Sequence, residues 1–301
     1  MTAKLTLGPV LFNWKPETWR DFYFRIADEA EVDTVCLGEV VCAKRAPFFA
    51  PLIPEVAERL SNAGKEVVFS TLALIMDERD MDLVRALAAD SDLMVEANDM
   101  SAVALLAGRP HVIGPFINTY NEGTLAFFAG RGALRVSLPA ELPAAATGVL
   151  AGAGVELEVQ VFGRAPLAIS ARCYHARLQG LHKDGCRYVC EQDPDGLRLE
   201  TLDGDAFLAI NGTQTLSHSY LNLIGELAAL EEAGIHRFRL SPHDMDMVAV
   251  AGIFRGVLDG RHEAARAARR LATLSGGVPF ANGFHHGRPG VDWTAPAALG
   301  E

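Results

Sequence analysis

The sequence predicts an α/β protein that folds as a (β/α)8 TIM-like barrel, with a cysteine-bearing insertion between strands seven and eight. Eight short apolar segments of strand character occur along the chain, and between them lie stretches with the 3.6-residue periodicity of amphipathic helices. Strands joined through helices pair in parallel, and eight such units is the number that closes a barrel. Before the last strand, the chain makes a long excursion that contains three of its five cysteines.

The eight expected strands cover residues 5–12, 34–40, 67–74, 93–97, 112–117, 134–138, 155–161 and 236–240. The first expected helix, residues 16–30, begins at a proline, and its Trp19, Tyr23 and Ile26 recur on one face. The second, residues 51–63, stops at Gly64 because glycine commonly ends helices. A doubly wound open sheet is the alternative, but it lacks support because no Gly-x-Gly-x-x-Gly motif follows any strand.

The insertion runs from about residue 170 to about residue 235 of a single barrel domain that takes in residues 1–301. After its cysteines, the turn-forming sequence Asp-Pro-Asp-Gly at 193–196 leads into a stretch of β character, residues 197–210. A helix is expected next, and its apolar face comprises Tyr220, Leu223, Ile224, Leu227 and Leu230. The tail from about residue 276 gives no clear element, and its His285-His286 pair is expected in a solvated loop rather than at a metal.

Composition limits the classes of function. Half of the 301 residues are apolar, enough for one large core, yet no apolar run reaches the roughly 20 residues of a membrane-spanning helix. The N-terminus runs directly into a strand-like segment, so we expect a soluble protein that stays in the cytoplasm. The net charge of −11 repels a phosphate backbone, which argues against nucleic acid as a ligand.

The five cysteines fall into two groups. Cys42 and Cys173 follow the second and seventh strands, and in a barrel the carboxyl ends of all strands open on one face. Cys186 and Cys190, spaced Cys-x3-Cys in a polar loop, are placed to complete a four-thiolate set with them. Cys36 lies inside an apolar strand, where a free cysteine behaves as a small packed side chain. An odd number of cysteines makes a structural disulfide framework improbable.

Four thiolates suit either zinc or an iron-sulfur cluster. Structural zinc usually draws on tight Cys-x2-Cys pairs, whereas this set has one Cys-x3-Cys pair and two distant ligands, so the spacing favours iron-sulfur and leaves zinc open. Lys44, Arg45 and Arg172 flank two of these cysteines. They are candidates for steering an anionic substrate or for balancing a cluster's negative charge, and solvated surface charges are the alternative.

Further polar residues follow the strands on the same face. The candidates for a substrate pocket are Glu39, Glu96, Asn118, Tyr120, Asn121 and Arg172. Asparagine and aspartate are also common as helix caps and in turns, so each of these residues is equally open to a structural role. The chain has no His-Glu-x-x-His, Gly-x-Ser-x-Gly or Gly-x-x-x-x-Gly-Lys motif, so zincin, serine hydrolase and P-loop functions lack their minimum parts.

Four segments together resemble a known family. Residues 38–45, 118–121, 162–173 and 211–215 are similar to the collagenase-like peptidase superfamily and, within it, to the UbiV type, which acts in oxygen-independent ubiquinone biosynthesis. The similarity spans residues 7–242. It implies a 4Fe-4S cluster held by Cys42, Cys173, Cys186 and Cys190. Many relatives carry a cysteine seven residues before the position of Cys173, where this chain has Pro166, and that departure separates the UbiV type from the rest.

The resemblance also implies partners and a reaction. A UbiU-like protein would form a heterodimer with this chain, and a lipid-binding accessory protein would present the ubiquinone precursor. The pair would hydroxylate the quinone ring without molecular oxygen. Whether this chain performs the chemistry or only transfers electrons is left open, and so is the enzyme assignment. The alternatives are a zinc-stabilised scaffold and a peptidase of the same superfamily.

Overall fold

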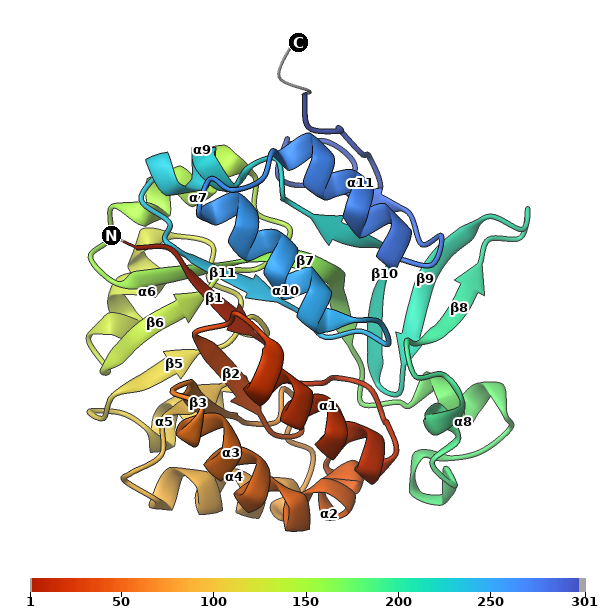
Figure 1. Cartoon of the computed structure of the whole chain (residues 1–301). Coiled ribbons are helices and arrows are strands. Elements are labelled where there is room, and N and C mark those ends of the chain that lie inside the picture. The colour runs from red at the N-terminus through yellow and green to blue at the C-terminus, as the bar shows by residue number, and fades with distance from the viewer. Residues whose placement is uncertain (1, 298–301) are drawn as a thin grey trace.

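A computed structural model describes residues 2–297, and eight parallel strands form a closed barrel at its centre (Figure 1). The barrel strands are β1 (Lys4–Leu7), β2 (Thr34–Leu37), β3 (Glu66–Ser70), β4 (Val95–Ala97), β5 (His111–Ile113), β6 (Ala133–Ser137), β7 (Glu156–Ile169) and β11 (Arg237–Leu240). Each pairs with the next in chain order, and β11 pairs with both β7 and β1. The predicted barrel, with its eight strands, is therefore confirmed.

Helices cover the outside of the barrel. They are α1 (Pro16–Glu29), α3 (Ile53–Asn62), α4 (Glu78–Ala89), α5 (Met100–Leu105), α6 (Glu122–Ala129), α7 (Ala144–Ala151), α10 (Met247–Leu258) and α11 (Ala264–Leu274). The predicted apolar face of α1 is buried, with Trp19, Tyr23 and Ile26 against the core. Between β2 and α3 the chain forms the short turns η1 (Ala43–Arg45), α2 (Ala46–Phe49) and η2 (Ala50–Leu52). None of the described helices is long and apolar enough to cross a membrane.

The insertion follows β7. It contains α8 (Tyr174–Leu178), η3 (Lys183–Gly185), η4 (Val189–Gln192), β8 (Leu197–Glu200), β9 (Ala206–Asn211), β10 (Gln214–Asn222) and α9 (Leu227–Glu232). β10 pairs antiparallel with β7 and with β9, so the barrel sheet continues into a three-stranded arm. Figure 1 shows the β8–β9 hairpin extending away from the barrel, with α8 near its base.

The structure corrects one prediction in the insertion and adds detail to a second. The helix expected to include Tyr220 begins only at Leu227, because residues up to Asn222 belong to β10. Tyr220 pairs with Arg164 of β7, and sheet pairing of this kind overrides helical periodicity. The stretch of β character at 197–210 is two strands joined by a turn, and the turn contains Gly204 with a φ of +89°.

The tail also differs from its prediction. It contains a short strand, β12 (Phe280–Ala281), which pairs with β10. Both histidines lie in a turn, as expected for a loop, but His285 is buried at 8% exposed, whereas His286 is exposed and its Nε2 lies 3.0 Å from Glu226 Oε1. The frequent glycine and proline residues of this segment hid the signal, although Val278 and Phe280 pack against the barrel core.

Candidate metal centre

Four cysteines from three separate segments line one cavity. Cys42 lies between β2 and η1, Cys173 immediately precedes α8, Cys186 follows η3, and Cys190 lies in η4. All five cysteines of the chain are free thiols, and Cys36 packs instead with Val68 in the barrel. The structure therefore brings together the four cysteines that the sequence grouped, and it places Cys36 apart from them.

A turn between β9 and β10, residues 211–214, connects two of the cysteine segments. Thr213 Oγ1 donates a 3.0 Å hydrogen bond to the carbonyl of Val41, which precedes Cys42. On the other side, the Tyr174 N–H donates to the Gly212 carbonyl and the Ser170 N–H to the Thr213 carbonyl, each at 2.9 Å. The turn thus fixes the chain on both sides of Cys173 relative to the chain before Cys42.

His175 ties a third segment to this turn. Its Nδ1 accepts the Gly212 N–H at 2.8 Å, and its Nε2 lies 3.1 Å from Asp193 Oδ2, three residues after Cys190. Since Nδ1 accepts, Nε2 carries the proton and donates to Asp193. Burial lowers the pKa of His175, which keeps the imidazole neutral in this role. The sequence did not single out His175, because its role is to bridge two distant segments and no spacing motif marks such a residue.

Glu39 holds the loop that carries Cys42. Its Oε1 accepts the N–H groups of Val41 at 2.8 Å and of Cys42 at 2.9 Å. Burial raises the pKa of Glu39, with the charge of Arg45, 4.0 Å away, opposing that effect. This pocket candidate therefore lies beside the cysteine cavity and serves the loop, rather than lining a substrate cleft.

Arg45 is the one cation among the cavity-lining residues that is fully buried, at 1% exposed. Its Nη1 donates to the Leu11 carbonyl at 2.9 Å and its Nη2 to Asn211 Oδ1 at 3.0 Å. Within residues 2–297, its Nε has no hydrogen-bond partner. Burial opposes its charge, yet Glu39, Cys190 and Cys42 hold the pKa of Arg45 above its ordinary value. A buried cation with an unused donor beside four thiols favours a negatively charged occupant.

The four cysteines are suitable donors for a four-thiolate centre, although their sulfur atoms are not arranged around a single ion. Across residues 2–297, no three cysteine, histidine, aspartate or glutamate side chains are arranged so that they could hold a metal ion. A tetrahedral zinc site needs every sulfur about 2.3 Å from one centre. An iron-sulfur cluster takes one thiolate per iron, so its ligands stand further apart. Burial raises the pKa of Cys42 and of Cys173, and metal loading would therefore release protons.

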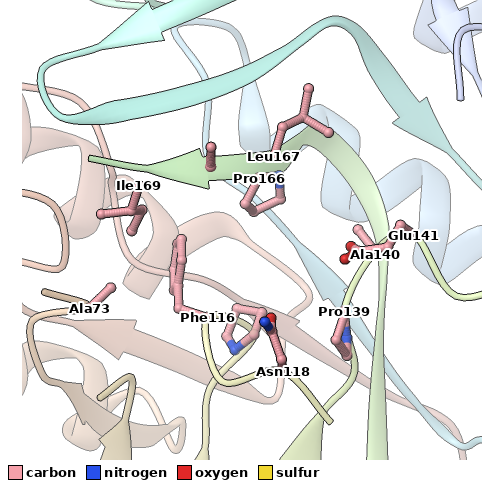
Figure 2. Close-up of a pocket in the computed structure, with 11 residues that line it drawn as sticks. Ala73, Phe116, Asn118, Pro139, Ala140, Glu141, Pro166, Leu167 and Ile169 are labelled. Carbon is pink, nitrogen blue, oxygen red and sulfur yellow. The ribbon is translucent and has the colours of Figure 1, made fainter. Parts of the chain in front are cut away.

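A cleft lies at the mouth of the barrel (Figure 2). Its volume is about 220 Å³. Phe116 extends towards the part of β7 that carries Pro166 and Ile169, and Asn118 and Glu141 are the polar side chains in the lining. Ile169, at the end of β7, lines the cleft, and Cys173, four residues later, lines the cysteine cavity. The arrangement is that of a small-molecule site: apolar walls with a few polar groups.

Tyr120 and Asn121 have identifiable partners. The Tyr120 hydroxyl donates to Glu141, a residue that the sequence analysis did not select, and burial together with this bond raises the pKa of Tyr120 to about 12. Asn121 caps α6 by accepting the Thr124 N–H at 2.9 Å. It also lines a second, open cleft that shares Phe116 with the first. Tyr120 thus positions Glu141 in the lining of the first cleft, whereas Asn121 has a structural role as the N-cap of α6.

Glu96 lies inside the barrel and not in either cleft. Arg239 Nη1 contacts Glu96 Oε2 at 2.6 Å and Glu158 Oε1 at 2.9 Å, and Ser70 donates to Glu96 at 2.9 Å. Burial opposes ionisation, but Arg239 and Arg135 hold the pKa of Glu158 below its ordinary value. This network fills the barrel core with paired charges, so Glu96 has a structural role here.

Arg172 lines a third cleft of about 550 Å³, next to Cys173. Arg177, His182 and Lys183 line it as well, and it contains no acidic side chain. Arg172 is exposed and, among the residues that the structure describes, forms no ion pair. Arg172 therefore lies beside Cys173 in an exposed, basic cleft.

Comparison with known proteins agrees with the resemblance at the level of the family. The sequence model of peptidase family U32 matches residues 20–295. Among solved structures, tryptophan synthase from Mycobacterium tuberculosis is 10% identical with a TM-score of 0.38, and the matched region covers 92% of this chain and 93% of that one. Phospho-2-dehydro-3-deoxyheptonate aldolase from Thermotoga maritima is 11% identical with a TM-score of 0.35, covering 93% of this chain and 71% of that one. Similarities this weak carry no argument about function, whereas the family match takes in most of the sequence. The chain belongs to peptidase family U32.

Proposed function

We propose that this protein is of the UbiV type: an iron-sulfur subunit of an oxygen-independent hydroxylase that acts on ubiquinone precursors together with a UbiU-like partner. One observation carries the proposal. Four thiols from three segments of the chain line a single cavity together with a buried arginine that has an unused N–H donor. A site built in this way suits an anionic four-thiolate centre.

The proposed 4Fe-4S cluster would supply one-electron chemistry when bound. Cys42, Cys173, Cys186 and Cys190 would hold it, and four protein thiolates leave no iron open to substrate. Electron transfer is therefore the role we assign to the site. Cys173, Cys186 and Cys190 are each less than 10% exposed, so the chain itself excludes most water from the thiolates. Such exclusion favours persistence of a cluster.

The apolar cleft at the barrel mouth is the proposed place of the quinone ring. Phe116 and Pro166 offer flat apolar surfaces, and Asn118 and Glu141 offer hydrogen-bonding groups for ring hydroxyls. Because the cleft adjoins the end of β7, a ring bound there would lie on the Cys173 side of the barrel. The cleft volume of about 220 Å³ suits a ring rather than a long isoprenoid tail, so the tail would remain outside.

Metal analysis of protein purified without oxygen tests the centre. We expect iron and sulfide in equal amounts, broad absorption in the visible range, and loss of most iron in each single alanine variant of the four ligands, which are Cys42, Cys173, Cys186 and Cys190. Zinc in place of iron would favour the scaffold alternative. Full iron in any one variant would remove that residue from the ligand set.

The reaction and the partners need separate tests. Cells without this protein should fail to make ubiquinone only when oxygen is absent, and they should accumulate under-hydroxylated precursors. Normal anaerobic ubiquinone in such cells would refute the hydroxylase role even if the cluster is present. Co-expression with a UbiU-like protein should give a one-to-one complex, and the lipid-binding accessory protein should increase turnover of the precursor. A catalytically competent homodimer would contradict the proposed heterodimer.

A further inference from the structure

We propose that Arg45 sets the reduction potential of the four-cysteine centre by placing a desolvated positive charge and a free N–H donor against its thiolates. The inference rests on the proposed function and assigns a role that the family match does not. Arg45 would not touch the substrate. It would act through the cluster, by stabilising the negative charge that arrives with an added electron.

The position of Arg45 is fixed by neutral groups. Two of its nitrogens are occupied by the Leu11 carbonyl and by Asn211 Oδ1, at 2.9 and 3.0 Å. Gly212 crowds the same guanidinium, since a Cβ at that position would lie 2.7 Å from Nη2. The side chain therefore cannot swing away from the cavity without displacing the turn between β9 and β10. Its Nε remains unpartnered within the described part of the chain.

Glu39 compensates the charge of Arg45 in part. The closest carboxylate, Glu39, lies 4.0 Å away and spends the same oxygen on two backbone N–H groups. Lys44, which also lines the cavity, donates to the carbonyls of Lys183 and Asp184, both at 2.8 Å. Lys183 points its ammonium at the sulfur of Met76. Among the residues that line the cavity, the cysteine thiolates are the groups that add negative charge next to Arg45.

A buried charge affects a redox centre more strongly than an exposed one because water does not screen it. When the cluster takes up one electron from a reductant, its total charge becomes more negative by one unit, and the protein gains no proton in this step. Arg45 stabilises the reduced form more than the oxidised form, so its charge raises the potential. Arg172, next to Cys173 but exposed, should have a much smaller effect.

The experiment compares three variants of the anaerobically purified protein: R45Q, R45K and the matched control R172Q. Redox titration with dithionite and dyes, followed by electron paramagnetic resonance, reports the ratio of reduced to oxidised cluster. At the wild-type midpoint, R45Q should lower that ratio at least tenfold, equivalent to about 59 mV for one electron. R45K keeps the charge and should restore most of the potential, and R172Q should match the wild type.

Each outcome decides the proposal. Wild-type potentials in both R45Q and R45K would overturn it while leaving the proposed cluster intact. If R45Q fails to load iron, loading by R45K with a near-wild-type potential still supports a requirement for charge. Equal loss of iron and of thermal stability in R45Q and R45K would show that Arg45 is only a structural residue. Absence of a cluster from the wild type would refute the proposed function itself.

Discussion

Replacing Asp195 by asparagine should destabilise the junction between the insertion and the barrel. Asp195 Oδ1 lies 2.6 Å from His243 Nδ1, and its Oδ2 accepts from Tyr220 at 2.8 Å and from Arg164 at 2.7 Å. His243 Nε2 accepts the Arg164 N–H at 2.9 Å, so Nδ1 carries the proton and donates to Asp195. One carboxylate thereby joins the turn after Cys190 to β7, β10 and the segment after β11.

The size of the effect follows from burial. Arg164 is 6% exposed at its side chain and Asp195 is 24% exposed. Removing one partner of a buried ion pair costs about 3–5 kcal/mol. Arg164 keeps the carbonyls of Asp195 and Ser217 as acceptors, so we expect the lower end, about 3 kcal/mol. For a chain of this length, that loss lowers Tm by roughly 6 °C.

The assay is thermal unfolding of wild type, D195N and the control D203N, which changes an exposed carboxylate in the turn of the same arm. D203N should leave Tm within about 1 °C because surface substitutions change stability little. An unchanged Tm in D195N would refute the argument that this carboxylate joins the insertion to the barrel.

The same residue predicts a pH dependence. Burial opposes its ionisation, but His243, Arg164 and Tyr220 hold the pKa of Asp195 well below its ordinary value. A carboxyl group with a lowered pKa in the folded state stabilises the protein above its unfolded pKa of about 4. That stabilisation is lost as the pH falls further. The Tm difference between wild type and D195N should therefore be constant near pH 7 and shrink below about pH 4.

The remaining predictions concern the cavity and the barrel interior. Gly212→Ala should lower the free energy of unfolding by about 1–2 kcal/mol, because φ at this position is +63°. The added methyl group should also displace Arg45 and so reduce the iron content. Unchanged iron would contradict the role of the turn. Cys36→Ser should keep the full iron content, because Cys36 lies outside the cavity; loss of iron would place it among the ligands. Glu96→Gln should lower Tm through loss of charge at Arg239 without changing iron per folded molecule, and parallel loss of iron would contradict a purely structural role.

The barrel and the grouping of the cysteines could be predicted because both depend on local, periodic signals. Each barrel strand is a short apolar run, and strand ends in a barrel converge on one face regardless of sequence distance. That geometry alone was enough to associate Cys42 with Cys173. The strand bounds differ by several residues at some ends, for example β7, which continues to Ile169 because β10 extends its pairing.

The supporting residues could not be predicted because their roles arise from contacts between distant segments. His175 and Glu141 have no spacing signature, and their partners, Asp193 and Tyr120, lie 18 and 21 residues away. The sequence identified Arg45 only as a charge beside a cysteine. Its burial depends on the turn at residues 211–214, which comes from a distant part of the chain. The helix expected at Tyr220 failed for the same reason, since pairing with β7 outweighed a local period.

The two halves of the proposed ligand set differ in how their positions are determined. Cys42 and Cys173 follow strands of the closed barrel, so the barrel fixes them. Cys186 directly follows one short 3-10 turn and Cys190 lies in the next, and between them Arg187 and Tyr188 adopt φ values of +52° and +54°. A left-handed conformation costs a non-glycine residue roughly 1–2 kcal/mol, so this loop needs contacts elsewhere to hold its shape. Under the proposed function, the bonds from Cys186 and Cys190 to the cluster would supply that energy, since metal binding is coupled to local folding. The cluster would then order the insertion on a barrel that is already formed. The conformation of the loop at residues 186–190 would depend on whether the site is occupied.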